Sequence, residues 1–219
     1  MPELVEFQRL WRELALPVPP PNAPTAAPSP VQVFSDLRTR YSEPHRYYHN
    51  FAHIDQCLQY LAEDEAAGRC SAPRLMAAAI WFHDAVYDTH ATDNEAQSAR
   101  LAGAWLPLPP AQAAVVEALI LDTRHQTPPA TADGRLLADI DLAGIGASAE
   151  GFALGCAHIR QEYGWVPADE YRTKRARFLQ TLLDRPQIYF TPTYRERFEA
   201  GARRNLAQEL RRLAQPETQ

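Results

Sequence analysis

The chain has 219 residues, of which 46% are hydrophobic and 22% are charged, a composition typical of a globular protein that is long enough to bury a core. Its net charge of −5 argues against an extended nucleic-acid-binding surface, although a local basic pocket is compatible with it. The three cysteines are widely spaced without a Cys-x-x-Cys pair, which argues against a disulfide framework or a zinc ribbon.

The N-terminal segment, residues 1–16, is expected to form an amphipathic helix. Its apolar residues recur at helical spacing and predict a face that packs onto the main body of the protein: Leu4, Phe7, Leu10, Trp11 and Leu14. The segment is acidic, unlike a secretion signal, and no apolar run in the chain reaches about 18 residues. We therefore expect a cytoplasmic protein without a membrane segment.

Residues 17–30, PVPPPNAPTAAPSP, contain seven prolines. Proline cannot donate a backbone hydrogen bond, so this stretch is predicted to be a connector that forms neither helix nor strand. A tolerated loop insertion is the simpler interpretation, and a ligand for a proline-binding domain is the alternative. We expect one domain with a long first connection, whose core spans residues 31–215, rather than two domains.

The predicted core has a helical period almost throughout, and proline or a capping residue precedes several of its segments. Only QIYF, residues 187–190, resembles a strand. The sequence therefore predicts an all-α, single-domain helical bundle of about eight to ten helices. Its helices after the connector are expected at 31–41, around Ile54, Leu58 and Leu61, from Pro73 to His83, at 93–105, 109–123, 148–164 and 167–184, and from Thr193 onward.

The first candidate for chemistry is the pair His83-Asp84 in WFHDAVYD, at the end of a long apolar stretch. A buried carboxylate needs a cation, hydrogen-bond donors or access to solvent. Neighbouring residues on a helix diverge by about 100°, yet their side chains could still reach one ion from adjacent sides. Taken alone, the pair is more simply interpreted as a core histidine beside a surface or capping aspartate.

Other ligand-type residues lie in similar positions along the chain. His49 and His53, in RYYHNFAHI, are spaced to share one face of a helix, and Asp139 and Asp141 interrupt the apolar run LLADIDLAGIG. Two imidazoles and two carboxylates around a divalent ion would leave positions open for water or substrate. This ligand set favours a catalytic site for Mn, Fe, Zn, Mg or Ni, with about one or two ions per chain.

The stretches YHNFAHI, WFHDAVYD, NEAQSA and DIDLAGIG follow one another in this order. Together they resemble the HD superfamily of metal-dependent phosphohydrolases, and more narrowly a predicted HD phosphohydrolase family. Two later stretches, IRQEYGW and RERFEAGARRNLAQEL, extend the resemblance over nearly the whole chain from Phe34, leaving out the Pro-rich connector. The resemblance implies a helical bundle of the HD type.

In that family the ion would be held by His49, His83, Asp84 and one late aspartate. The stretch ADIDL fits the family pattern in two registers, one through Asp139 and one through Asp141. We favour Asp141 as the ligand, with Asp139 as its hydrogen-bonding partner or as the alternative ligand.

Four further residues are candidates for catalysis. His53 could bind a second metal ion, contact phosphate or be structural, and His125 could join the site or simply complement a helix dipole. Glu95 could orient water or a ligand, or be an ordinary acidic residue of a first helical turn. Arg160, in IRQEY, could present its guanidinium to a phosphate.

The preferred function is hydrolysis of a small phosphate ester or anhydride, with a nucleotide as one candidate, through a metal-bound water. The chain shows no constellation for a serine or cysteine nucleophile and no Gly-rich phosphate loop. Two alternatives stay open, a di-iron oxygenase of the HD type and a non-catalytic metal-binding interaction module.

Overall fold

The computed structural model describes residues 2–18 and 28–215, and all regular structure within these ranges is helical. This confirms the predicted all-α class; the strand-like stretch 187–190 is irregular. No single helix among the described residues is long and apolar enough to span a membrane, and only the broken pair 132–146 and 149–162 would qualify if its halves are taken together.

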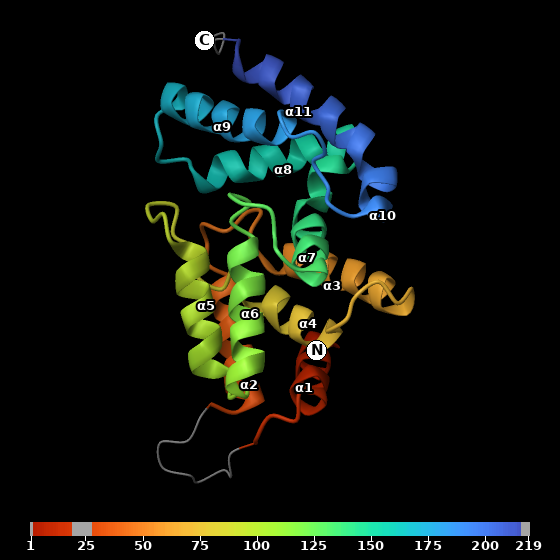
Figure 1. The fold of residues 1–219 in the computed structure, drawn as a ribbon. Coiled ribbons are helices and arrows are strands. Elements are labelled where there is room, and N and C mark those ends of the chain that lie inside the picture. The colour runs from red at the N-terminus through yellow and green to blue at the C-terminus, as the bar shows by residue number, and fades with distance from the viewer. Residues whose placement is uncertain (1, 19–27, 216–219) are drawn as a thin grey trace. The chain divides into compact units, whose positions relative to one another are not determined.

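The chain divides into two compact units, residues 1–137 and 138–219. The boundary falls inside one helix, α7. That the whole chain behaves as a single domain stays a prediction. The helices of the first unit (Figure 1) are α1 (Pro2–Glu13), α2 (Pro30–Tyr41), α3 (Phe51–Ala66), α4 (Pro73–Phe82), α5 (Asn94–Trp105), α6 (Pro110–Asp122) and the start of α7 (Ala132–Leu142).

Prolines mark several helix starts in this unit. Pro30, Pro73 and Pro110 each occupy the beginning of a helix, where the amide that proline lacks would have no partner within the helix. Pro30 therefore belongs to α2, whose N-cap residue is Ser29. The predicted connector, residues 17–30, extends one residue too far. Residues 19–27 of the predicted connector lie outside the described residues.

Aromatic side chains form the core of the first unit. The ring of Phe7 from α1 meets Trp81 of α4 edge-on, with ring centroids 5.3 Å apart, and Phe34 and Phe51 also pack against Trp81 at 6.0 Å. Full burial of each such side chain stabilises the fold by about 1.5–3 kcal/mol. These contacts confirm that the N-terminal helix packs back onto its unit.

A distant carboxylate fixes the start of α4. The N-cap position of this helix is Ala72, whose side chain cannot accept a hydrogen bond. Asp133 of α7 supplies the missing acceptor: its Oδ1 accepts from the Ser71 amide at 2.9 Å, and its Oδ2 accepts from the Ser71 hydroxyl at 2.7 Å and the Ala72 amide at 2.8 Å. The direction in which α4 begins is therefore set by α7.

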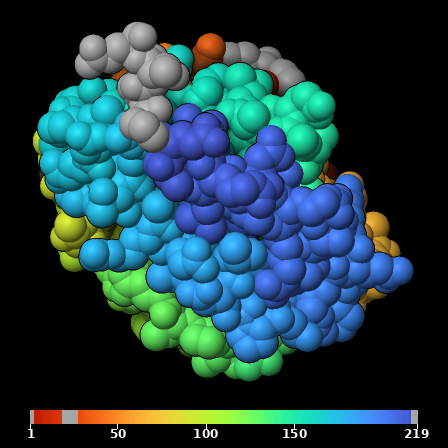
Figure 2. Space-filling model, turned by 90° about the horizontal axis from the view of Figure 1, so that it is seen from above, coloured from red at the N-terminus to blue at the C-terminus, as the bar shows by residue number. Residues whose placement is uncertain are grey.

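In the second unit, α11 lies beside α9 and α8, and Figure 2 shows the face that these three helices form. The predicted helices 148–164 and 167–184 are confirmed within two residues at either end. The unit contains the end of α7, η1 (Ala143–Gly146, a 3-10 helix), α8 (Ala149–Glu162), α9 (Ala168–Leu183), α10 (Pro192–Tyr194), η2 (Arg195–Glu199, a π-helix) and α11 (Ala200–Leu213).

The last predicted helix begins at Pro192, one residue earlier than expected, and contains the π-helical turn η2. Directly after this turn, the backbone of Gly201 passes against Gly146. A Cβ at Gly201 would lie 2.8 Å from the carbonyl oxygen of Gly146, and a Cβ at Gly146 would lie 2.6 Å from the Cβ of Phe198. Only glycine allows the two backbones to approach this closely.

Candidate metal centre

The His83-Asp84 pair lies where α4 ends. His83 is the C-cap residue of α4 and is 3% exposed, and Asp84 follows in a turn. Their side chains converge, with His83 Nε2 3.1 Å from Asp84 Oδ2. The two side chains thus reach one point from adjacent sides.

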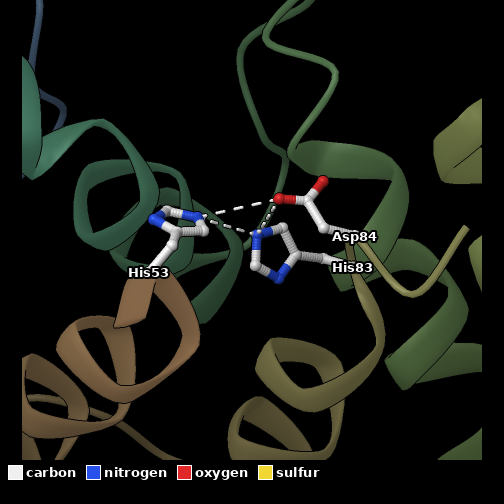
Figure 3. A group of neighbouring side chains, drawn as sticks. All are labelled: His53, His83 and Asp84. Atoms are coloured by element: carbon white, nitrogen blue, oxygen red, sulfur yellow. Dashed lines mark hydrogen bonds and ion pairs between the residues drawn. The ribbon is translucent and has the colours of Figure 1, made fainter. Parts of the chain in front are cut away.

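His53, from the first turn of α3, points at the same place (Figure 3). Its Nε2 lies 3.2 Å from His83 Nε2 and 3.8 Å from Asp84 Oδ2. The three residues form a group whose potential ligand atoms all lie within 4.8 Å of one another. Two imidazoles and a carboxylate from two helices of the first unit therefore surround a single point.

The hydrogen bonding of His83 indicates what this point requires. His83 Nδ1 lies 2.9 Å from the carbonyl oxygen of Ile80, and because a carbonyl can only accept, Nδ1 must carry the proton. In a neutral imidazole Nε2 then bears a lone pair, which here faces a carboxylate oxygen and the nitrogen of His53. A proton on one of these nitrogens, or a metal ion between the three groups, would each link the atoms at this point.

The spacing of the three atoms can be compared with what a shared proton and a metal ion each require. A shared proton bridges only two of the atoms, whereas a metal ion can bind all three. Ligand atoms that share one ion at about 2.0–2.2 Å lie roughly 2.8–3.6 Å from one another. Two of the observed separations, 3.1 and 3.2 Å, lie in this range and the third, 3.8 Å, is slightly longer. The residues present fit a small divalent ion.

The electrostatics keep Asp84 in the form that a cation needs. Burial disfavours the charged carboxylate, but the imidazoles of His83, His49 and His53 outweigh this effect and lower the pKa of Asp84. The same carboxylate, added to the effect of burial, raises the pKa of the nearby Tyr41 hydroxyl. Asp84 is thus an anion over the whole neutral pH range.

The position of His49 corrects one prediction. Helix α3 begins at Phe51, and the side chain of its N-cap residue Asn50 accepts from the Ala52 amide at 2.9 Å. His49 therefore precedes the helix, and the prediction that it shares a helical face with His53 is wrong. Its ring stacks on Tyr87, with centroids 4.2 Å apart. His53 forms a group with His83 and Asp84, while the imidazole of His49 also lowers the pKa of Asp84, and a ligand role for His49 stays a prediction.

The other predicted residues of the first unit lie outside this group of three. Glu95 is in the first turn of α5, with Oε2 3.8 Å from Nε of Arg124. His125 follows α6 with a left-handed backbone, φ 55°. Catalytic roles for Glu95 and His125 stay predictions.

Asp139, in the second unit, has hydrogen-bond donors around it. The residue is fully buried; its Oδ1 accepts from the Phe190 amide, and its Oδ2 accepts from the amide and hydroxyl of Thr191, all at 2.7 Å. Burial raises the pKa of Asp139 to about 6. The hydrogen bonds from Phe190 and Thr191 lower the pKa, because they favour the charged form, but their effect is smaller than that of burial. Asp139 thus fixes the start of α10. Because its oxygens already accept these hydrogen bonds, Asp141 is the better candidate for the predicted late ligand, and its ligand role stays a prediction.

Arg160, also in the second unit, contacts its own end of α8. Its Nη1 donates to the Tyr163 carbonyl at 2.7 Å and its Nη2 to the Val166 carbonyl at 3.1 Å, while the guanidinium lies 4.6 Å from the ring centre of Tyr171. These contacts close the connection between α8 and α9. The predicted contact with phosphate stays a prediction.

One residue beside the group has no predicted role. Arg46, the first residue of the stretch RYYHNFAHI, donates to the backbone carbonyls of His49 and Asp84. The signal in the sequence was an arginine directly before the histidines, and its spacing gave no reason to distinguish it from a surface residue.

Comparisons of the chain with protein-family models, with curated proteins and with solved structures found no match. The family resemblance therefore stays a prediction from the motifs. What supports a function is the grouping of ligand atoms at the end of α4.

Proposed function

We propose that this protein is a metal-dependent phosphohydrolase whose ion is held by His53, His83 and Asp84. The observation that carries the proposal is the convergence of their ligand atoms within 4.8 Å. His83 Nδ1 donates a hydrogen bond to the Ile80 carbonyl, which leaves Nε2 as the nitrogen that would bind an ion. A divalent ion at this point would be attracted by the charge of the Asp84 carboxylate and could accept a lone pair from each imidazole.

The ligand set supports a catalytic rather than a purely structural ion. Two nitrogens and one oxygen leave coordination positions for water and substrate, whereas structural zinc sites are closed by four protein ligands. When bound, a divalent ion would lower the pKa of water and neutralise charge on a phosphoryl group. The protein's own part is to orient the ligands: Ile80 holds His83 in one tautomer, and the imidazoles keep Asp84 ionised.

The metal is the first point to test. The full chain would be purified and freed of metal, and its affinity for Mn, Fe, Zn, Mg and Ni measured by titration, with bound metal determined by elemental analysis. We expect about one ion per chain for the preferred metal and at least a tenfold loss of affinity in His83→Ala and Asp84→Asn. The exposed pair Asp88 and His90, 3.1 Å apart, supplies the matched control: His90→Ala should bind metal as the wild type does.

Activity is the second point. The metal-loaded protein would be offered a panel of small phosphate esters and anhydrides in oxygen-18 water, with phosphate release and oxygen uptake recorded. Label in the released phosphate, lost in Asp84→Asn, would support the proposal. Undiminished metal content in a folded His83→Ala/Asp84→Asn variant would contradict it. Metal binding without turnover would instead favour an interaction module, and substrate-dependent oxygen uptake would favour an oxygenase.

A further inference from the structure

Arg46 is a charged side chain that is only 1% exposed. A buried guanidinium is tolerated when its donors find acceptors, and here each nitrogen does. Nε donates to Glu43 Oε2 at 2.9 Å, Nη1 donates to the carbonyls of His49 at 3.2 Å and Asp84 at 2.6 Å, and Nη2 donates to the carbonyl of Ala85 at 3.2 Å.

The three carbonyls belong to the two segments that carry the candidate ligands. One is the turn of His49, directly before α3 and His53, and the other is the turn that contains Asp84. The rings of Tyr41 and Tyr87 lie 5.1 and 5.4 Å from the guanidinium carbon and hold its plane. Arg46 therefore joins two backbone segments that are far apart in the sequence, at the point where their side chains meet.

We propose that Arg46 is a positioning residue that sets the affinity of the metal site by holding these two segments together. This inference rests on the proposed function. Ligand groups must be held to within about 0.5 Å of their working geometry, and the three carbonyl bonds of Arg46 fix the backbone on both sides of the site. Loss of these bonds would let the two segments separate.

Charge and position make opposite predictions for Arg46. A guanidinium near a divalent ion repels it, so an effect through charge alone would strengthen metal binding when Arg46 is removed. An effect through position would weaken metal binding, and lysine would not restore it, because an ammonium lacks the planar fork that reaches several carbonyls at once. The sign of the change in affinity therefore identifies the role.

The second unit contains a matched control. Arg203 has a similar set of acceptors without candidate ligands, on a side chain that is 36% exposed. Its Nε donates to Glu199 at 2.8 Å, its Nη1 donates to the Leu183 carbonyl at 3.1 Å, and its Nη2 donates to the carbonyls of Arg185 and Pro186 at 2.9 and 3.0 Å. Arg203→Ala removes as many backbone contacts as Arg46→Ala. It reports what a loss of stability alone does to metal binding.

The experiment measures metal affinity and stability side by side. Full-length wild type, Arg46→Ala, Arg46→Lys and Arg203→Ala would be titrated with Zn and with Mn against a competing chelator, and unfolded by urea in the metal-free state. We expect Arg46→Ala and Arg46→Lys to weaken metal binding by about 10-fold or more. Arg203→Ala should lower the urea midpoint with metal affinity within about twofold of the wild type.

Each other outcome has a definite meaning. Unchanged or stronger metal binding in folded Arg46→Lys, or an equal loss in Arg203→Ala, overturns the positioning role while leaving the proposed metal site intact. A wild type that binds no metal overturns both proposals. If Arg46→Ala does not fold, Arg46→Lys and Glu43→Gln, which keep the size of the side chains, decide the question; Glu43→Gln should weaken binding less than Arg46→Lys.

Discussion

The two compact units each contain a buried or nearly buried aspartate in an apolar stretch, and they treat it in opposite ways. In the first unit, Asp84 faces the nitrogens of His83 and His53 at 3.1 and 3.8 Å. In the second unit, Asp139 faces three donors from Phe190 and Thr191, each at 2.7 Å. Burial alone therefore does not identify a ligand. The partners are more informative, because amide and hydroxyl groups can only offer Asp139 a hydrogen bond, whereas the imidazoles beside Asp84 are also able to bind a metal ion.

This difference can be tested most strongly at Asp139. Replacement by alanine leaves the amides of Phe190 and Thr191 without their acceptor at a fully buried position, and we expect a loss of about 2–4 kcal/mol in the free energy of unfolding. Asp139→Asn keeps one acceptor oxygen and should lose less. Urea unfolding measures the effect, and hydrogen exchange of the segment 188–194 locates it. A loss below about 0.5 kcal/mol would show that the donors find other acceptors.

The first unit has its own donor-bound carboxylate, Asp133, which is 8% exposed. Asp133→Ala should cost about 1–2 kcal/mol, less than Asp139→Ala, because water can reach the amides of Ser71 and Ala72 when the carboxylate is gone. Thermal unfolding measures the loss. The exchange rates of these two amides provide the local control: rates equal to those of the wild type would mean that Asp133 does not hold the start of α4.

Asp84 should behave differently from both when no metal is present. Asp84→Asn keeps the size of the side chain, and its amide can donate to an imidazole nitrogen, so we expect a change within about 1 kcal/mol in metal-free protein. With metal at about 100 times its Kd, the wild type should gain about 2.7 kcal/mol and the variant little. Unfolding with chelator and with metal separates the two cases. A large loss in the metal-free variant would give Asp84 the same structural role as Asp139.

The smallest effect is expected from the Pro-rich connector. Removal of three residues within 19–27 should change the stability by less than about 0.6 kcal/mol, since the entropy of loop closure varies slowly with length. Ser29→Ala, which removes the cap of α2, is the internal control and should cost about 1 kcal/mol. A larger loss from the deletion than from Ser29→Ala would indicate specific packing of the prolines.

Much of the fold could be predicted from the sequence because its helices are marked locally. Proline at the start of α4 and α6 and the periodic apolar residues of α3 depend on neighbours within one or two turns. The π-helical turn η2 and the division into two units could not be predicted in this way, since both depend on contacts between residues far apart in the chain.

The candidate site was predictable to the level of residue types. The pair His83-Asp84 was found by its position at the end of an apolar stretch, and the histidines of YHNFAHI were found by their spacing and by the motif that they belong to. The different backbone settings of His49 and His53 could not be predicted from their spacing, because a single N-cap residue, Asn50, places one before the helix and the other inside it. The distinction between Asp84 and Asp139 depends on hydrogen-bond partners from distant segments, which no local pattern reports.

The close approach of Gly146 and Gly201 provides an internal standard for mutational scanning. Any side chain at Gly201 meets a backbone oxygen, and any at Gly146 meets the backbone and Cβ of Phe198. Both positions should therefore reject every substitution in any selection that requires folded protein, whatever activity is being selected. Depletion at these glycines together with tolerance at His83 would describe a protein selected for its fold alone, and depletion at all three would describe one selected for its chemistry.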